Sequence, residues 1–274
     1  MEPVLSAWRA GRAAAGPAIT QPVHDLREIV SAILYVNRAG CAWHLLPHDF
    51  PPYQTVCGYY AAREKDGTTA AIHDLLRARV RGKAGRAAGP AAAILDAQSV
   101  KTSGNAPESS QGTDAGKKIK GRKRHIATDT PGLLLAVLVT AAPAQDNGGG
   151  KALTGELATA HPGVNRVWAD SGYKRAVADE GAGHGIQVEV YAKPAGLKRF
   201  RATPRRPVER TFGWLMPHRR LARDHETLPE RSITAIHWSM TDNMSRRLTG
   251  ESTQPGATPR PKPANHQPLR RDAL

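Results

Sequence analysis

Apolar residues recur along the first part of the chain at the three- and four-residue spacing of amphipathic helices. Asp25 followed by Glu28 resembles a helix capping box, and Gly40 can end the helix that follows. The apolar residues on one face of this helix are Leu26, Ile29, Val30, Ile33 and Leu34. A second series of the same kind comprises Ile72, Leu75, Leu76 and Val80. The spacing therefore predicts a helical region up to about residue 82.

The helical spacing ends in a segment rich in glycine, alanine and basic residues, Arg81–Pro90. Such a composition is typical of a linker, so we expect a helical domain at 1–85 and a second domain at 86–251. The remaining residues, 252–274, include five prolines and no aromatic residue. Because this composition cannot bury a core, the segment is predicted to be a disordered tail.

Short apolar runs follow the linker and predict strands in place of helices. The five predicted strands are Ala92–Leu95, His125–Thr128, Leu133–Thr140, Val167–Ala169 and Ile186–Tyr191. A turn at Asp129–Gly132 predicts a hairpin between the second and third. The predicted helices are Lys151–Ala160, Arg175–Ala182, Val208 to about Asp224, and Ile233–Leu248. We therefore expect an α/β domain with a mixed five-stranded sheet flanked by helices.

Charge and composition limit the classes of molecule that this protein is expected to bind. Lys and Arg number 39 against 24 Asp and Glu, a formal charge of +15, which favours a polyanion such as nucleic acid. A membrane surface is the other candidate, but the longest apolar stretch, Leu133–Ala142, is far shorter than the roughly 20 residues of a membrane span. The two cysteines allow no disulfide framework. These features predict a soluble, cytoplasmic protein.

Three acidic residues occupy positions where a sheet could bring them together. Asp96 follows the first predicted strand, Asp170 follows the fourth, and Glu209 lies near a helix start. Carboxylates are the ligands that Mg²⁺ prefers, and two such ions about 3.5 to 4 Å apart can stabilise the attacking and the leaving oxygen of a phosphodiester. Taken singly, each residue is more simply explained as a turn or helix-start residue.

The sequences around these acids strengthen the metal interpretation. The three strings are ILDAQSVKT (Ile94–Thr102), VWADSGY (Val167–Tyr173) and RRPVERTFGWL (Arg205–Leu215). Together they resemble the IS-five family of bacterial insertion-sequence transposases, over most of residues 25–251. The resemblance implies an RNase H-like fold in which Asp96, Asp170 and Glu209 form a DDE triad. It also implies two Mg²⁺ ions as cofactor, with Mn²⁺ able to replace them.

The resemblance implies a reaction and its partners. One metal-activated water nicks the end of the element, and the freed 3′-hydroxyl attacks target DNA. The partners are then double-stranded DNA, as terminal inverted repeats and as target, and a second copy of the chain in a homodimer. By resemblance alone, 1–85 reads the DNA ends and the protein associates with the bacterial nucleoid. Two alternatives stay open: a catalytically impaired copy that binds DNA as a repressor or competitor, and a metal-dependent nuclease.

Basic residues near the acids are candidates for DNA contacts. The run KKIKGRKRH (Lys117–His125) is predicted to form a loop entering a strand, where it could follow a phosphate backbone. Its basic residues are Lys117, Lys118, Lys120, Arg122, Lys123 and Arg124. Near Glu209, the candidates are Arg205 before it and Arg219, Arg220 and Arg223 after it, partly on the same predicted helix. The alternative for both sets is a solvated charged surface.

Several residues depart from the pattern associated with the family. Pro217 interrupts the predicted glutamate helix, at a cost of about 3 kcal/mol for a proline inside a helix. Pro207 lies near the start of that helix, where proline is tolerated. Ser171 stands where glycine is common, and Asp242 and Asn243 make the last helix more polar. These departures suggest a drifting copy whose transposition activity is weak or lost.

A zinc site and a base-binding aromatic were also considered. Cys41, His44, His48 and Cys57 have the right chemistry for zinc, but their spacing matches no common zinc finger. Core and turn positions are the preferred interpretation. The tryptophans Trp43, Trp168, Trp214 and Trp238 lie in apolar surroundings and are predicted to pack in the core.

Overall fold

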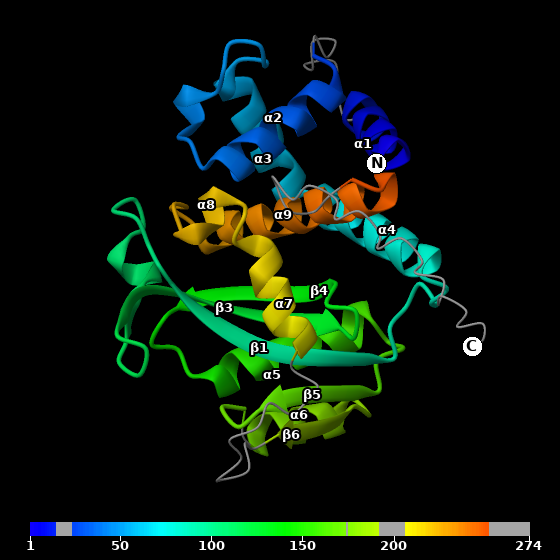
Figure 1. Ribbon diagram of the computed structural model, residues 1–274, viewed down its shortest axis with the longest axis vertical. Helices are drawn as coiled ribbons and strands as arrows, with labels where there is room; N and C mark the ends of the chain where they lie inside the picture. Colours follow the sequence, from blue (N-terminus) through cyan, green and yellow to red (C-terminus); the bar gives the residue numbers. More distant parts are fainter. Residues whose placement is uncertain (15–23, 174, 192–205, 252–274) are drawn as a thin grey trace, which may run out of the picture.

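The computed structural model describes residues 1–14, 24–173, 175–191 and 206–251, and Figure 1 shows their arrangement. Helices from the N-terminal part lie at one end of the molecule, and the sheet lies toward the other. The long helix α9 (Pro229–Thr249) runs between them. Arg205 and the predicted tail, 252–274, lie outside the described residues.

The N-terminal region is helical, as its apolar spacing predicted. Its elements are α1 (Glu2–Ala14), α2 (Leu26–Ala39), the 3-10 turn η1 (Trp43–Leu45), α3 (Tyr53–Lys65) and α4 (Thr68–Lys83). In α2, the Asp25 side chain caps the N-terminus by accepting a hydrogen bond from the backbone N–H of Arg27 at 2.9 Å. Gly40, with φ +70°, ends the helix in the left-handed region that glycine adopts without strain.

The sheet is mixed and has the strand order β2-β3-β1-β5-β6, with β4 also paired to β3. Its strands are β1 (Ala92–Lys101), β2 (Gly112–Asp114), β3 (Ile119–Asp129), β4 (Leu134–Ala141), β5 (Arg166–Asp170) and β6 (Gln187–Tyr191). Strands β1, β3 and β4 are antiparallel, whereas β5 and β6 run parallel to β1. Within the described residues the sheet therefore has six strands, and the prediction of five is wrong because the short, polar β2 has no apolar run.

Strands β1 and β3 are longer than the apolar runs from which they were predicted. β1 continues six residues beyond Leu95 and β3 starts six residues before His125, because the two strands pair with each other from Ala93↔Asp129 to Lys101↔Gly121. Backbone pairing thus extends through polar segments that hydrophobicity alone does not mark. The predicted hairpin between β3 and β4 is confirmed, with the N–H of Gly132 donating to the carbonyl of Asp129 at 2.9 Å.

Helices cover both faces of the sheet, as expected for an RNase H-like domain. α5 (Asp146–Ala160) packs on β3 and β4, and α6 (Arg175–Gly183) packs on α5 and β6. On the opposite face, α7 (Arg206–Leu215) crosses β1 and β3, and α9 packs on β4 (Figure 1). The predicted fold class, an α/β RNase H-like domain preceded by helices, is confirmed.

The helix predicted from Val208 to about Asp224 is interrupted. α7 ends at Leu215, and the short α8 (Arg219–Ala222) begins after Pro217. The break has a steric cause, since proline lacks an N–H and disfavours the helical conformation of the preceding residue. α7 itself remains intact, with Pro207 near its start, where proline fits.

The N-terminal helices and the sheet share one hydrophobic core. One cluster of buried residues includes Ile33 and Ile72 from the N-terminal helices, Ile126 from β3 and Trp238 from α9. A second cluster lies under α5 and α6 on the other face of the sheet. Trp43, Trp168 and Trp214 pack against the first cluster, which confirms the predicted core role of the four tryptophans. The division into two functional domains at residues 85/86 stays a prediction. The hydrophobic core is continuous across this boundary.

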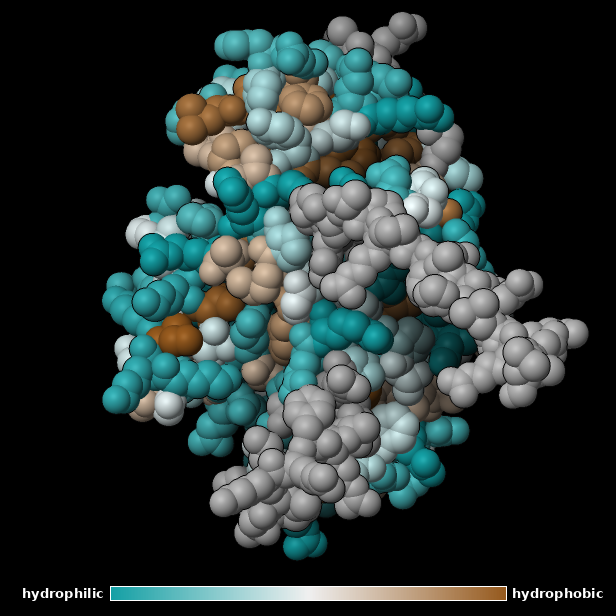
Figure 2. Space-filling view, viewed as in Figure 1, coloured by the Kyte–Doolittle hydropathy of each residue, from teal (hydrophilic) through white to brown (hydrophobic). Residues whose placement is uncertain are grey.

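On the face drawn in Figure 2 hydrophilic residues predominate, with apolar patches in the helical part. None of the helices in the described part of the chain combines the length and apolar character that a membrane span requires.

Asp242, a polar residue in the predicted apolar helix, has three basic partners. It pairs with Arg38 of α2, with His218 at 3.1 Å and with Arg246 at 3.1 Å. Burial alone would raise the pKa of the Asp242 carboxyl, but hydrogen bonds from His218 and Arg38 and the charges of Arg38 and Arg246 outweigh it. The pKa therefore lies well below its usual value of 3.8. The carboxylate ties α9 to the N-terminal helices.

We expect this carboxylate to contribute to stability at neutral pH and to lose its contribution in acid. A depressed folded-state pKa means that the stabilisation is complete above pH 3.8 and declines as pH falls below it. The Asp242→Asn variant should therefore unfold at lower temperature than wild type at pH 7, and the difference should shrink below pH 4. Thermal unfolding across pH, with Asp179→Asn as a control for losing one exposed carboxylate, measures this. A difference that stays constant with pH would contradict the assignment.

Candidate active site

The pairing of two parallel strands places Asp96 and Asp170 next to each other. β1 and β5 pair from Ala92↔Arg166 to Ile94↔Trp168. Asp96 and Asp170 each follow the last of these pairs by two residues, and both line one cavity. Asp170 is thus at the carboxyl end of β5, as predicted, whereas Asp96 lies in the middle of β1. The carboxyl ends of parallel strands are common ligand sites in open α/β sheets.

A cavity of about 380 Å³ opens at this point of the sheet. Its lining residues are Asp96, Ala97, Gln98, Ser99, Lys117, Asp146, Asp170 and Phe212. Ser99 donates a hydrogen bond at 2.6 Å to Asp114, and this bond, with one from the backbone N–H of Lys117, holds the pKa of Asp114 below its usual value. Three aspartates and one lysine are thus among the residues that line the cavity.

Three of the lining residues are aspartates. The Asp96 carboxylate accepts a hydrogen bond from the backbone N–H of Ala97 at 2.8 Å. Asp170 accepts one from the N–H of Gly172 at 2.8 Å. Asp146, in the first turn of α5, pairs with Lys123 at 2.9 Å. The third carboxylate was not among the residues predicted from sequence.

Glu209 is exposed and lies outside the lining of this cavity. It belongs to the first turn of α7, and Phe212, three residues later, does line the cavity. Residues three apart share one face of a helix, so Glu209 lies on the face of α7 that borders the cavity. The structure brings Asp96 and Asp170 to one cavity, and Glu209 is not among the residues that line it.

The carboxylate side chains that line the cavity are of the chemical type that binds divalent cations. Carboxylate oxygens are the ligands of Mg²⁺ and Mn²⁺, and Asp96, Asp146 and Asp170 supply them in one cavity. Within the residues that the structure describes, no three His, Cys, Asp or Glu side chains are close enough, as they stand, to enclose a metal ion. Cys41, His44 and Cys57 line a separate cavity of about 1070 Å³ beside α3, and they too are not close enough to one another to enclose a metal ion.

The basic run predicted as a loop is largely part of the sheet. Only Lys117 and Lys118 precede β3; from Ile119 the chain is a strand, which pairs with β2 at its start and with β1 and β4 on its two sides from Arg122 onward. Arg122 and Arg124 are fully buried, and Lys123 is nearly so. The loop prediction is therefore wrong, because strands on both edges and helices on both faces enclose these charged side chains.

Each of these three side chains has a polar partner that is distant in sequence. Arg122 pairs with Asp224 at 3.3 Å, Arg124 donates to the carbonyl of Leu221 at 2.8 Å, and Lys123 pairs with Asp146. Successive side chains of a strand point to opposite faces, so the two arginines reach toward α8 while the lysine reaches α5. In this conformation the three side chains are not available to DNA.

The other basic candidates divide by exposure. Lys117, Lys118 and Lys120 are exposed, as are Arg219 and Arg223. Arg220 is buried and pairs with Glu226 at 2.5 Å, stacking over Trp43 at 5.2 Å. Because the helix breaks at Pro217, these three arginines do not share a helix with Glu209.

A further pair of arginines was missed by the sequence analysis. Arg210 and Arg247 lie on Trp214, with guanidinium-to-ring distances of 5.0 and 3.8 Å, and so place two positive charges beside α7. Burial, followed by the charge of Arg210, lowers the pKa of Arg247. The two residues lie 37 positions apart, so no local sequence signal links them.

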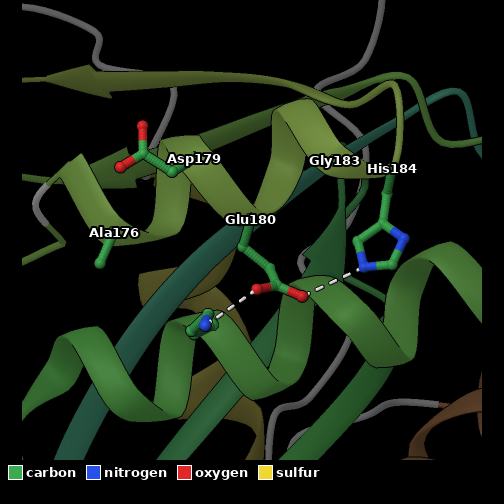
Figure 3. Close-up of a pocket in the computed structure, with 6 residues that line it drawn as sticks. Ala176, Asp179, Glu180, Gly183 and His184 are labelled. Carbon is green, nitrogen blue, oxygen red and sulfur yellow. Dashed lines mark hydrogen bonds and ion pairs between the residues drawn. The ribbon is translucent and has the colours of Figure 1, made fainter.

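A small surface cavity between α5 and α6 also contains acidic residues. Figure 3 shows Glu180 between its two partners, Lys151 at 3.2 Å and His184 at 3.1 Å, while Asp179 points away from them. The cavity is open to solvent, and its central carboxylate already has two basic partners. It offers no comparable set of acidic ligands.

Comparisons with known proteins agree with the geometry. Residues 1–73 match the model of a domain ascribed to transposases of the IS4/5 family. Residues 87–240, more than half of the chain, match the Transposase DDE domain. No protein with a curated description matches the chain.

Proposed function

Because the chain belongs to the DDE transposases of the IS4/5 group, we propose that it cleaves DNA at the ends of its own element and joins them to target DNA, using Asp96, Asp170 and Glu209. Transposition and DNA binding are the general functions of these families. The observation that carries the finer proposal is the acidic cavity, where Asp96 and Asp170 from adjacent parallel strands lie together under α7.

The protein side chains have distinct roles in this proposal. Asp96 and Asp170 hold divalent ions, with Glu209 closing the site from α7. Transposase DDE domains generally use divalent metal ions, and we propose two Mg²⁺ ions, which would activate the attacking oxygen and neutralise charge at the phosphorus. In the first step water adds to the phosphorus and the 3′-oxygen leaves. In the second, that 3′-hydroxyl attacks a target phosphodiester and displaces its 3′-oxygen.

Exposed basic residues next to the cavity supply the proposed DNA contacts. Lys117 lines the cavity, and Lys118 and Lys120 continue from it along the start of β3. Arg219 and Arg223 lie near the break after α7 and remain in the proposal. Arg205 is also retained, from the sequence resemblance alone. Contacts of this kind bind phosphates without reading bases, and they weaken as salt increases.

Two features support activity over the alternative of an inactive DNA-binding copy. Pro217 ends α7 after Leu215, so Glu209 remains in an uninterrupted helix. Asp242 has basic partners and does not leave an uncompensated charge in the core. The departures from the family pattern are therefore compatible with an intact site.

An assay with purified full-length protein distinguishes the possible functions. The substrates are a labelled DNA fragment carrying the ends of the element and a supercoiled target plasmid, with Mg²⁺ or Mn²⁺. We expect cleavage and joined products that disappear with a chelator. Cleavage without joining would instead indicate a nuclease. Binding of the labelled DNA without cleavage would favour the alternative of a repressor.

A further inference from the structure

Asp146 lies in the proposed metal site although no motif of the sequence marked it. It lines the same cavity as Asp96 and Asp170 and comes from a different element, the first turn of α5. The side chain is 31% exposed, so it is accessible from the cavity. A carboxylate on a third element enlarges the set of possible ligands.

The carboxylates of Asp146 and Asp170 approach a common point beside Gly172. A Cβ atom on Gly172 would lie 2.9 Å from Oδ1 of Asp170 and 3.0 Å from Oδ2 of Asp146. Glycine leaves that space open, so the two carboxylates border a small acidic recess. Any larger residue at position 172 would press against both oxygens. The recess is thus formed by backbone and carboxylate together.

The ammonium group of Lys123 contacts one carboxylate oxygen of Asp146, Oδ1. The Nζ atom of Lys123 is 2.9 Å from Oδ1 of Asp146 and 2.7 Å from the carbonyl of Ala144. The lysine side chain is only 9% exposed. Its buried ammonium indicates that this position accommodates positive charge among oxygen atoms, while the second oxygen, Oδ2, lies beside Gly172, as does Oδ1 of Asp170.

We propose that Asp146 is a fourth carboxylate of the divalent-metal site, acting with Asp170 through its Oδ2 oxygen, while Lys123 fixes the orientation of the carboxylate through Oδ1. This inference rests on the proposed metal-dependent function. It adds a ligand from α5 on the side of the cavity opposite α7. A carboxylate held by a second, fixed partner is oriented before a metal arrives, which is the general role of such supporting contacts.

Mn²⁺ binding to the full-length chain, measured by calorimetry or by the Mn²⁺ electron-spin signal without DNA, tests the proposal. We expect Asp146→Asn to weaken Mn²⁺ binding about tenfold or more, in the range usual for lost ligand-shell contacts. The matched control is Asp179→Asn, an exposed aspartate on α6 outside the cavity, for which binding should stay within about twofold of wild type. Thermal unfolding without metal reports on folding of each variant.

Asp170→Asn separates failure of this inference from failure of the proposed function. If Asp170→Asn weakens Mn²⁺ binding but Asp146→Asn does not, only the fourth ligand is wrong. If neither substitution changes binding, the metal site proposed for this cavity is wrong, and the inference falls with it.

A change of metal preference distinguishes a ligand role of Asp146 from a purely structural role. Thiolate favours soft cations, so Asp146→Cys should bind Mn²⁺ less tightly and gain affinity for Cd²⁺ relative to wild type. Wild type provides the background from Cys41 and Cys57, which lie outside the cavity. Loss of Mn²⁺ binding in a folded Asp146→Cys variant with no gain for Cd²⁺ would overturn the proposal, because a thiolate at a ligand position should bind the softer metal.

Discussion

Replacing Asp170 by asparagine should lower DNA cleavage by the purified protein by about 10² to 10³-fold or more, the usual effect of removing a group that stabilises transition-state charge. The variant should still fold and bind DNA. Asparagine keeps an oxygen that can accept the hydrogen bond from the N–H of Gly172, so the turn after β5 is preserved. Only the negative charge is lost.

Cleavage rate and DNA binding are measured on the same preparations, with Asp179→Asn as the control for an exposed aspartate. Asp96→Asn should have the same effect as Asp170→Asn, because both carboxylates line one cavity. Cleavage within a few-fold of wild type in either variant would remove that residue from the active site.

Glu209→Gln is the informative third member of this series. The proposal expects the same large loss, although Glu209 is exposed and is not among the residues that line the cavity. If Glu209→Gln retains cleavage while both aspartate variants lose it, the third acidic ligand comes from another element. Asp146 would then be the first candidate, since it already lines the cavity.

Replacing Arg122 by methionine should cost about 3–5 kcal/mol of folding free energy, the usual result of removing one partner of a buried ion pair. Arg122 is fully buried and pairs with Asp224 at 3.3 Å. It also donates to the carbonyls of Glu226 at 2.8 Å and Thr227 at 2.7 Å. The variant leaves the Asp224 charge buried, with Ser232 as one of its remaining donors.

Urea denaturation measures this loss, and Lys120→Met on the same strand provides the control. Lys120 pairs with Glu108, but both side chains are more than half exposed, so its loss should cost no more than about 1 kcal/mol. The double variant Arg122→Met, Asp224→Leu should recover part of the stability, because it removes both charges. Equal losses for Arg122→Met and Lys120→Met would show that the buried pair is not a major source of stability.

Several features of the fold are already present in local sequence. The apolar face of α2 and its end at Gly40 follow from helical spacing and from the conformational freedom of glycine. The β3–β4 hairpin follows from the turn at Asp129–Gly132. Pro217 marks the end of α7, although the predicted helix extended beyond it. These features depend on neighbours within a few residues.

The burial of the basic run could not be read from the sequence. Charged residues in an alternating segment normally predict a solvated strand or loop. Arg122 is instead buried because Asp224, about a hundred residues later, lies against it. Asp146 was missed for a related reason, since its sequence context, DNGGG, resembles a loop and only α5 packing brings it beside Asp170.

Local sequence was sufficient to predict the helical N-terminal region, the α/β order of the rest and two candidate aspartates that line one cavity, Asp96 and Asp170, because periodicity and motifs act over short distances. The burial of the basic residues in β3 and the position of Asp146 in the acidic cavity became evident only from the tertiary structure. Those outcomes depend on contacts between distant segments, since a side chain's surroundings are set by whatever element packs against it.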